Sequence, residues 1–311
     1  MNPFYSLIAA SSLAFIYVGS LYVWRSDHDR DSPITIKRRF LSAFCTVCIS
    51  PFVVKYFVSE ELLEKQSLYE IIGIRREGLC NAVLIPLLLT VILFAGPIAV
   101  SLSNDRRKIR TKLHGWKSVL TDWIFWRNHV VAPFTEEFTF RYDKLYNLYP
   151  DNNHQNFIKT MISNATINIF PCFCIKCFRA CMLPILLRNW SVKASIVISP
   201  MLFGIAHFHH MIEKIQKGQD VKSALFMSSF QFAYTTIFGA YSAHLFVQTN
   251  HLAACVVVHA FCNFMGFPDF VELLNLPPTK RMTLSIVYVA GLVSFFMLLP
   301  LFTSSHLYAI N

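Results

Sequence analysis

The stretch TLSIVYVAGLVSFFMLLPLF, which runs from Thr283 to Phe302, contains no Asp, Glu, Lys or Arg. Roughly 20 apolar residues in a helix are enough to cross the hydrocarbon core of a bilayer, so this stretch predicts a membrane-spanning helix. Uncharged stretches of similar length occur elsewhere in the chain, at Phe4–Val23, Leu79–Leu102 and Ala224–Val247. Together they predict an integral membrane protein that crosses the bilayer repeatedly.

The composition agrees with a membrane protein. The 311 residues are 54% hydrophobic and only 15% charged, whereas a soluble domain carries about 25% charged residues. Weaker apolar stretches, interrupted by polar residues, lie at Phe40–Val58, Val130–Phe140, Ala194–His210 and Leu252–Phe267. Isolated polar groups are costly in lipid, so such helices usually face a bundle interior or a wet cavity. We therefore expect the functional residues on these weaker stretches.

The basic residues that give the net charge of +10 cluster in loops beside the apolar stretches. One cluster is Lys37–Arg39, and another extends from Arg106 to Lys112. This arrangement is typical of the positive-inside rule rather than of a nucleic-acid-binding face. It predicts that both loops face the cytosol, near anionic lipid head groups, and that the N-terminus is lumenal or extracellular.

The segment Trp116–Asn128 carries aromatic and basic residues at helical spacing. Such a pattern is typical of a helix that lies in the plane of the membrane surface, so we expect an interfacial amphipathic helix on the cytosolic side. The alternative is that this segment begins the next membrane-spanning helix.

Adjacent acids stand at the edge of a weak apolar stretch. Glu136 and Glu137 are neighbours, and Arg141 follows Glu137 by four positions. Residues i and i+4 share one face of a helix, so Arg141 can pair with Glu137 and hold it ionised. That pairing leaves Glu136 in the drier setting, which suits a general base. The alternative is an interfacial helix with a surface ion pair.

Further polar residues with chemical potential are His207, His259 and Asn263. His259 and Asn263 lie four positions apart and share a helical face, and an imidazole and a carboxamide can both donate hydrogen bonds to an oxyanion. With a carboxylate base and His207 to orient water, this set resembles a hydrolase site that lacks a nucleophilic Ser or Cys. The alternative for each histidine is a structural role.

Other chemistries remain open at the same residues. A zinc protease could use His207, His259 and an acid, although the chain has no His-Glu-x-x-His motif. A transporter or channel could relay protons through them, although no duplicated halves are visible. A local cysteine cluster lies in an apolar run, where Cys commonly serves as a small hydrophobic residue, at Cys172, Cys174, Cys177 and Cys181. We therefore predict no metal and no other cofactor.

Blocks of sequence around these residues resemble the type II CAAX prenyl endopeptidases, a family of intramembrane glutamate proteases to which CAAX prenyl protease 2 belongs. The blocks are Ala132–Glu137 (APFTEE), Phe203–His210 (FGIAHFHH), Gln231–Tyr241 (QFAYTTIFGAY) and His259–Pro268 (HAFCNFMGFP). The resemblance covers roughly residues 40 to 268, and it extends beyond single motifs.

The resemblance implies an endopeptidase of the endoplasmic reticulum membrane that removes the last three residues after a prenylated cysteine, with its active site open to the cytosol. It implies that Glu136 activates water with His207 as its partner, and that His259 and Asn263 form the oxyanion site. Glu137 and a nearby Arg would support the assembly, without a metal. The implied partners are membrane lipid and farnesylated or geranylgeranylated CAAX proteins, such as Ras-like GTPases.

The chain departs from the family pattern between Arg141 and Phe178. In the family, the double glutamate leads through an Arg directly into a stretch like ACMLP, which here follows Arg179 instead of Arg141. Removing residues 141–178 restores a continuous match, so we expect an insertion, either a retained intron or a lineage-specific loop. Either Arg141 or Arg179 then fills the motif. A chain that keeps the insertion is expected to fold poorly or to be inactive, because charged sequence interrupts a membrane helix.

The removal also joins Val130–Phe140 and Arg179–Leu187 into one apolar stretch. The predicted fold is therefore all-α, a polytopic bundle of about eight spanning helices plus the interfacial helix, in which residues 1–311 form a single membrane-embedded protease domain.

Overall fold

The computed structural model describes residues 3–24, 28–57, 67, 70, 73–104, 121–140, 186, 189–206, 208–216 and 218–308. Within these ranges all regular elements are helical, and no strand occurs. The predicted all-α class is thus confirmed.

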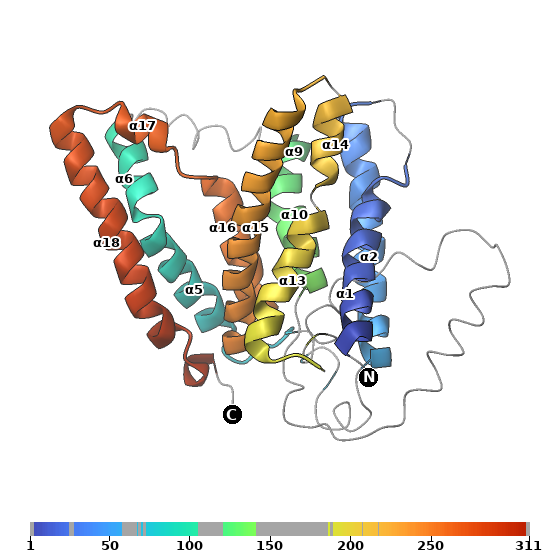
Figure 1. Ribbon diagram of the computed structural model, residues 1–311. Coiled ribbons are helices and arrows are strands. Elements are labelled where there is room, and N and C mark those ends of the chain that lie inside the picture. Colours follow the sequence, from blue (N-terminus) through green and yellow to red (C-terminus); the bar gives the residue numbers. More distant parts are fainter. Residues whose placement is uncertain are drawn as a thin grey trace, which may run out of the picture.

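The long helices lie side by side along a common direction (Figure 1). The elements in chain order are α1 (Pro3–Leu21), α2 (Pro33–Phe57), α5 (Leu79–Leu93), α6 (Ala95–Asn104), α9 (Trp123–Trp126), the π-helical segment η1 (Arg127–Val131), α10 (Ala132–Phe140), α13 (Val192–Ala206), α14 (His209–Gln216), α15 (Val221–Thr249), α16 (Leu252–Met265), α17 (Phe270–Leu274), α18 (Pro278–Phe302) and the short 3-10 helix η2 (Ser305–Tyr308).

The helices of the bundle form a central pair with a group of helices on either side. Helices α15 and α16 form an antiparallel pair in the middle, with α1 and α2 on one flank and α5, α6 and α18 on the other (Figure 1). Helix α16 packs against α5, α10 and α15, while α10 also packs against α2. The α10 segment that carries Glu136 and Glu137 therefore lies against the helix that carries His259 and Asn263.

Short polar side chains define where helices begin. The carboxylate of Asp122 accepts the backbone N–H of Ile124 at the start of α9, and that of Asp220 accepts the N–H of Ser223 at the start of α15. Both are N-caps, which satisfy backbone donors that have no partner inside the helix. Asn250 ends α15 in the left-handed region, with φ of 51°, so the chain reverses tightly into α16.

By length and composition, one helix of the described ranges, α18, can cross a membrane. Helices α5 and α6 add a second span if this pair, bent by 64°, counts as one. Only 17% of the apolar window of α18 is buried, so this helix lies on the outside of the bundle and is not a buried core helix. The expected number of spans, about eight, is not confirmed.

The interfacial helix expected at Trp116–Asn128 is described only from Thr121 onward. From Trp123, α9 continues without a break through η1 into α10, which favours the alternative that this segment begins a longer helix. The segment 141–178, its cysteine cluster and the basic cluster from Arg106 to Lys112 lie outside the described residues.

Candidate active site

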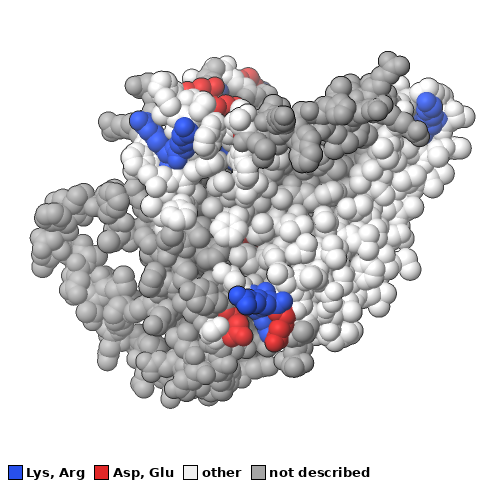
Figure 2. Space-filling model, turned by 180° about the vertical axis from the view of Figure 1, so that it is seen from behind, with Lys and Arg blue, Asp and Glu red and all other residues white. Residues whose placement is uncertain are grey.

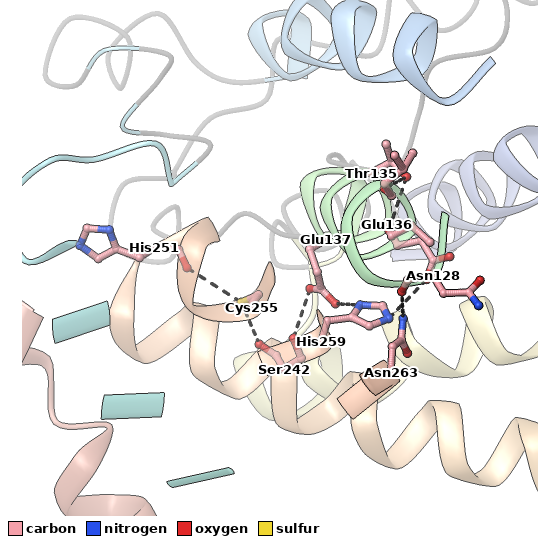
Figure 3. A network of polar contacts seen from close by, with 11 residues as sticks. Asn128, Thr135, Glu136, Glu137, Ser242, His251, Cys255, His259 and Asn263 are labelled. Carbon is pink, nitrogen blue, oxygen red and sulfur yellow. Dashed lines mark hydrogen bonds and ion pairs between the residues drawn. The ribbon is translucent and has the colours of Figure 1, made fainter. Parts of the chain in front are cut away.

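The centre of the bundle contains a network of polar contacts between α10, α15 and α16 (Figure 3). The buried residues of α16 include Cys255, Val258, His259 and Cys262, which repeat at the spacing of one helical face. His259 therefore points into the bundle, while Asn263, one turn later, lies at its exposed end.

Glu137 is the buried anchor of this network. Its side chain is 3% exposed, and Oε1 lies 2.8 Å from His259 Nδ1. The hydroxyl of Ser242, on α15, donates to Oε2 of the same carboxylate at 3.2 Å. A buried carboxylate with donors on both oxygens is a satisfied group, and its contact with Nδ1 sets the orientation of the imidazole ring.

Glu136 faces the other nitrogen of the same ring. Its Oε2 lies 3.8 Å from His259 Nε2, and its side chain is 22% exposed. A separation of 3.8 Å is longer than a hydrogen bond. Adjacent residues of one helix thus meet opposite sides of one imidazole: Glu137 bonds to it, and the more accessible Glu136 stands farther off.

Asn263 is tied to the helix that precedes the glutamates. Its Nδ2 donates to the backbone carbonyl oxygen of Asn128 at 2.8 Å. Because a carbonyl oxygen can only accept, this contact fixes which end of the carboxamide faces Asn128. One N–H of the same nitrogen is left for another acceptor.

Aromatic rings border the network. The Phe238 ring meets His259 edge-on, with the ring centroids 4.9 Å apart, and His129 stacks on Phe125 at 4.5 Å. Apolar walls exclude water and so strengthen electrostatic contacts inside a site.

The structure brings together Glu136, Glu137, His259 and Asn263 from the set of residues expected from the sequence. His207, Arg141 and Arg179 lie outside the described residues, so the water-orienting role of His207 and the pairing of Glu137 with Arg141 stay predictions.

The expectation that Glu136 occupies the drier setting is wrong. The side chain of Glu137 is 3% exposed and that of Glu136 is 22% exposed. The reason is that α10 turns Glu137 toward α15 and α16, where Ser242 and His259 bury it.

The sequence analysis missed Ser242 and Asn128. Ser242 follows directly on a block that carries the family resemblance, but an isolated Ser in an apolar helix gives no signal of its own. Asn128 contributes a backbone carbonyl, which residue type does not reveal. In the described part of the chain, no group of His, Cys, Asp and Glu side chains is arranged to hold a metal ion.

Comparisons with known proteins agree with the resemblance. A family described as type II CAAX prenyl endopeptidase Rce1-like matches residues 176–265. CAAX prenyl protease 2 of Homo sapiens is 38% identical over 97% of this chain and 82% of its own length. The protein of the same name from Rattus norvegicus is 33% identical over 97% of this chain and 81% of its own length. That from Arabidopsis thaliana is 28% identical over 96% of this chain and 86% of its own length.

No solved structure matches the chain. The relatives are aligned over nearly the whole chain, and the family match contains Ser242, His259 and Asn263 of the polar network. The chain therefore belongs to the type II CAAX prenyl endopeptidase family.

Proposed function

We propose that this protein is an intramembrane endopeptidase that removes the C-terminal tripeptide from farnesylated or geranylgeranylated CAAX proteins, Ras-like GTPases among them. Glu136 activates the attacking water, and His259 and Asn263 stabilise the oxyanion. The substrate class is that named by the relatives, CAAX prenyl protease 2.

The observation that carries the roles is the position of His259 between the glutamates. Its Nδ1 lies 2.8 Å from Glu137 and its Nε2 lies 3.8 Å from Glu136. An ionised carboxylate can only accept, so Nδ1 carries a proton. Donation from Nε2 to an oxyanion then requires the imidazolium form, in which both ring nitrogens carry a proton. Glu136 is left as the accessible carboxylate.

The reaction balances with these groups. Glu136 takes a proton from water, and the water oxygen bonds to the carbonyl carbon of the prenylated cysteine. The carbonyl oxygen becomes an oxyanion and accepts hydrogen bonds from His259 Nε2 and Asn263 Nδ2. The C–N bond then breaks, and the proton held by Glu136 passes to the departing nitrogen.

We further propose that the bundle crosses the endoplasmic reticulum membrane about eight times, with the site open to the cytosol. The charge distribution supports this proposal, because on the face in Figure 2 the described Lys, Arg, Asp and Glu gather near the ends and leave a broad uncharged band between them. The large exposed apolar residues of α18 suit contact with lipid, among them Met282, Ile286, Val289 and Met297. A prenyl chain partitions into lipid, so its protease must meet the substrate there.

We also propose that residues 141–178 are an insertion into the single protease domain. Support comes from the family match, which begins at residue 176, near the downstream seam, and leaves out Glu136 and Glu137. Sequencing transcripts across the junction tests the idea of a retained intron. Reads that always contain the segment would show instead a lineage-specific loop.

The main test is tripeptide release from a farnesylated C-terminal peptide by membranes that contain the protein. Replacing Glu136 with Gln removes the general base and keeps the side-chain shape, so we expect release to fall at least ~100-fold. Glu77→Gln is the matched control, since Glu77 is exposed in the loop before α5. Full activity of Glu136→Gln would contradict the assignment of the base.

Adding a zinc chelator to the same assay distinguishes a glutamate protease from a zinc protease. We expect the rate to be unchanged by a zinc chelator. A loss that added zinc restores would favour the zinc protease, and absence of cleavage by the wild-type chain would favour an inactive scaffold.

A further inference from the structure

The carbonyl oxygen that holds Asn263 is available because of a local break in helical hydrogen bonding. In an α-helix, the carbonyl of Asn128 would accept from the N–H of Ala132, four residues later. Here Ala132 N–H reaches back to the carbonyl of Arg127, which closes the wider π-turn of η1. In that wider register the donor for Asn128 would come from residue 133, which is a proline and has no N–H.

Asn263 takes the place of the missing helical donor. Its Nδ2 lies 2.8 Å from the Asn128 oxygen, and π-turns of this kind are frequent at functional sites. We propose that Pro133 is a positioning residue: by withholding a backbone N–H, it reserves the Asn128 carbonyl for the Asn263 carboxamide. This inference rests on the proposed role of Asn263 as an oxyanion donor.

Neighbouring contacts hold the carbonyl in place. The Arg127 Nε donates to Asn128 Oδ1 at 2.9 Å, and Arg127 Nη1 donates to Asp31 Oδ1 at 2.7 Å. One turn later, the hydroxyl of Thr135 donates to the Val131 carbonyl at 2.8 Å. Side-chain hydrogen bonds thus hold both ends of η1 in place. The Asn128 carbonyl faces α16 (Figure 3).

The test replaces Pro133 with Ala, which fits a helix and supplies an N–H that competes for the Asn128 carbonyl. We expect kcat for tripeptide release to fall about tenfold with KM little changed, because losing one oxyanion donor altogether costs about 100- to 1,000-fold. The decisive measurement is the same replacement in an Asn263→Ala background, where Pro133→Ala should have no further effect. Pro300→Ala, at an exposed proline inside α18, is the matched control and should leave kcat unchanged.

A second variant covers the case in which Pro133→Ala does not assemble. Asp31→Asn removes the ion pair of Arg127 from an exposed position, since the Asp31 side chain is 56% exposed. It should lower kcat about two- to fivefold, again only while Asn263 is present. An unchanged kcat of Pro133→Ala, or equal losses from this replacement with and without Asn263, would overturn the positioning role of Pro133.

The proposed function is checked separately. If Asn263→Ala by itself keeps full kcat, the oxyanion assignment fails and the positioning role fails with it. If Asn263→Ala is impaired and Pro133→Ala is not, only the positioning role fails.

Discussion

At the scale of single residues, Ser242 controls the environment of the buried glutamate. Its hydroxyl donates to Glu137 Oε2 at 3.2 Å, and both residues are buried. A carboxylate with a partner on each oxygen is held in one orientation. Ser242 therefore helps Glu137 to keep the imidazole of His259 oriented.

Replacing Ser242 with Ala should lower kcat/KM for tripeptide release. Without the hydroxyl, Glu137 loses its hydrogen-bond donor from α15, so the carboxylate holds the His259 imidazole less firmly. A hydrogen bond to a charged group contributes about 1.5 kcal/mol or more, which corresponds to about a tenfold loss in rate. The measurement is the rate of tripeptide release at a fixed pH.

Ser228→Ala is the control for this experiment. Ser228 lies on the same helix, is also buried, and has a hydroxyl without a hydrogen-bond partner among the described residues. It should leave kcat/KM unchanged. The same loss in both variants would mean that any loss of a buried hydroxyl from α15 perturbs the site.

How much of the site the sequence reveals depends on the kind of group. Acids and histidines inside apolar stretches stand out, so Glu136, Glu137 and His259 are found directly. Which glutamate is buried depends on how α10 is rotated against its neighbours, and sequence spacing alone does not contain that information. The role of the Asn128 carbonyl cannot be predicted from the sequence for a different reason: every residue has a backbone carbonyl.

At the scale of elements, close contact between α18 and the α5–α6 pair depends on small residues. A Cβ atom added at Gly291 would lie 2.6 Å from the Ile92 backbone oxygen and 3.3 Å from the Ala95 Cβ. Backbone atoms of a helix cannot move aside as a side-chain end can. The glycine thus lets α18 approach the bend that separates α5 from α6.

Gly291→Ala should therefore destabilise the protein by about 1–3 kcal/mol, the usual cost of overpacking. Gly19→Ala is the matched control, because a Cβ atom at Gly19, in α1, would meet nothing within 4 Å. Thermal unfolding in detergent measures both variants. Equal melting temperatures would show that α18 adjusts its position without cost.

The uncharged stretches predicted helices better than they predicted where helices bend. Thr283–Phe302 falls entirely inside α18, and Ala224–Val247 inside α15. Leu79–Leu102, by contrast, is split into α5 and α6 with a bend of 64°. An apolar pattern does not mark the bend, which lies just before Gly96 and Pro97. Pro97 has no N–H to donate to the carbonyl four residues earlier, so the helix breaks there.

At the scale of the whole molecule, the proposed insertion of residues 141–178 leads to a prediction about activity. Deleting it joins Phe140 to Arg179. In the shortened chain, Arg179 then stands four positions after Glu137, where Arg141 stands in the longer chain. We expect the shortened chain to release tripeptide at least about tenfold faster per molecule than the 311-residue chain, because a charged interruption of a membrane helix costs several kcal/mol per unpaired backbone group.

The comparison uses equal amounts of both forms in the same membranes, with Glu136→Gln in each as the blank. Full activity of the longer form would show that the segment is a tolerated loop. Activity of the longer form alone would show that the segment is part of the enzyme.

Helix α1 begins and α18 ends at the same end of the bundle (Figure 1). In the proposed membrane arrangement, this placement requires an even number of crossings from the start of α1 to the end of α18. A variant that gained or lost a single span would carry the end of α18 to the opposite side of the membrane.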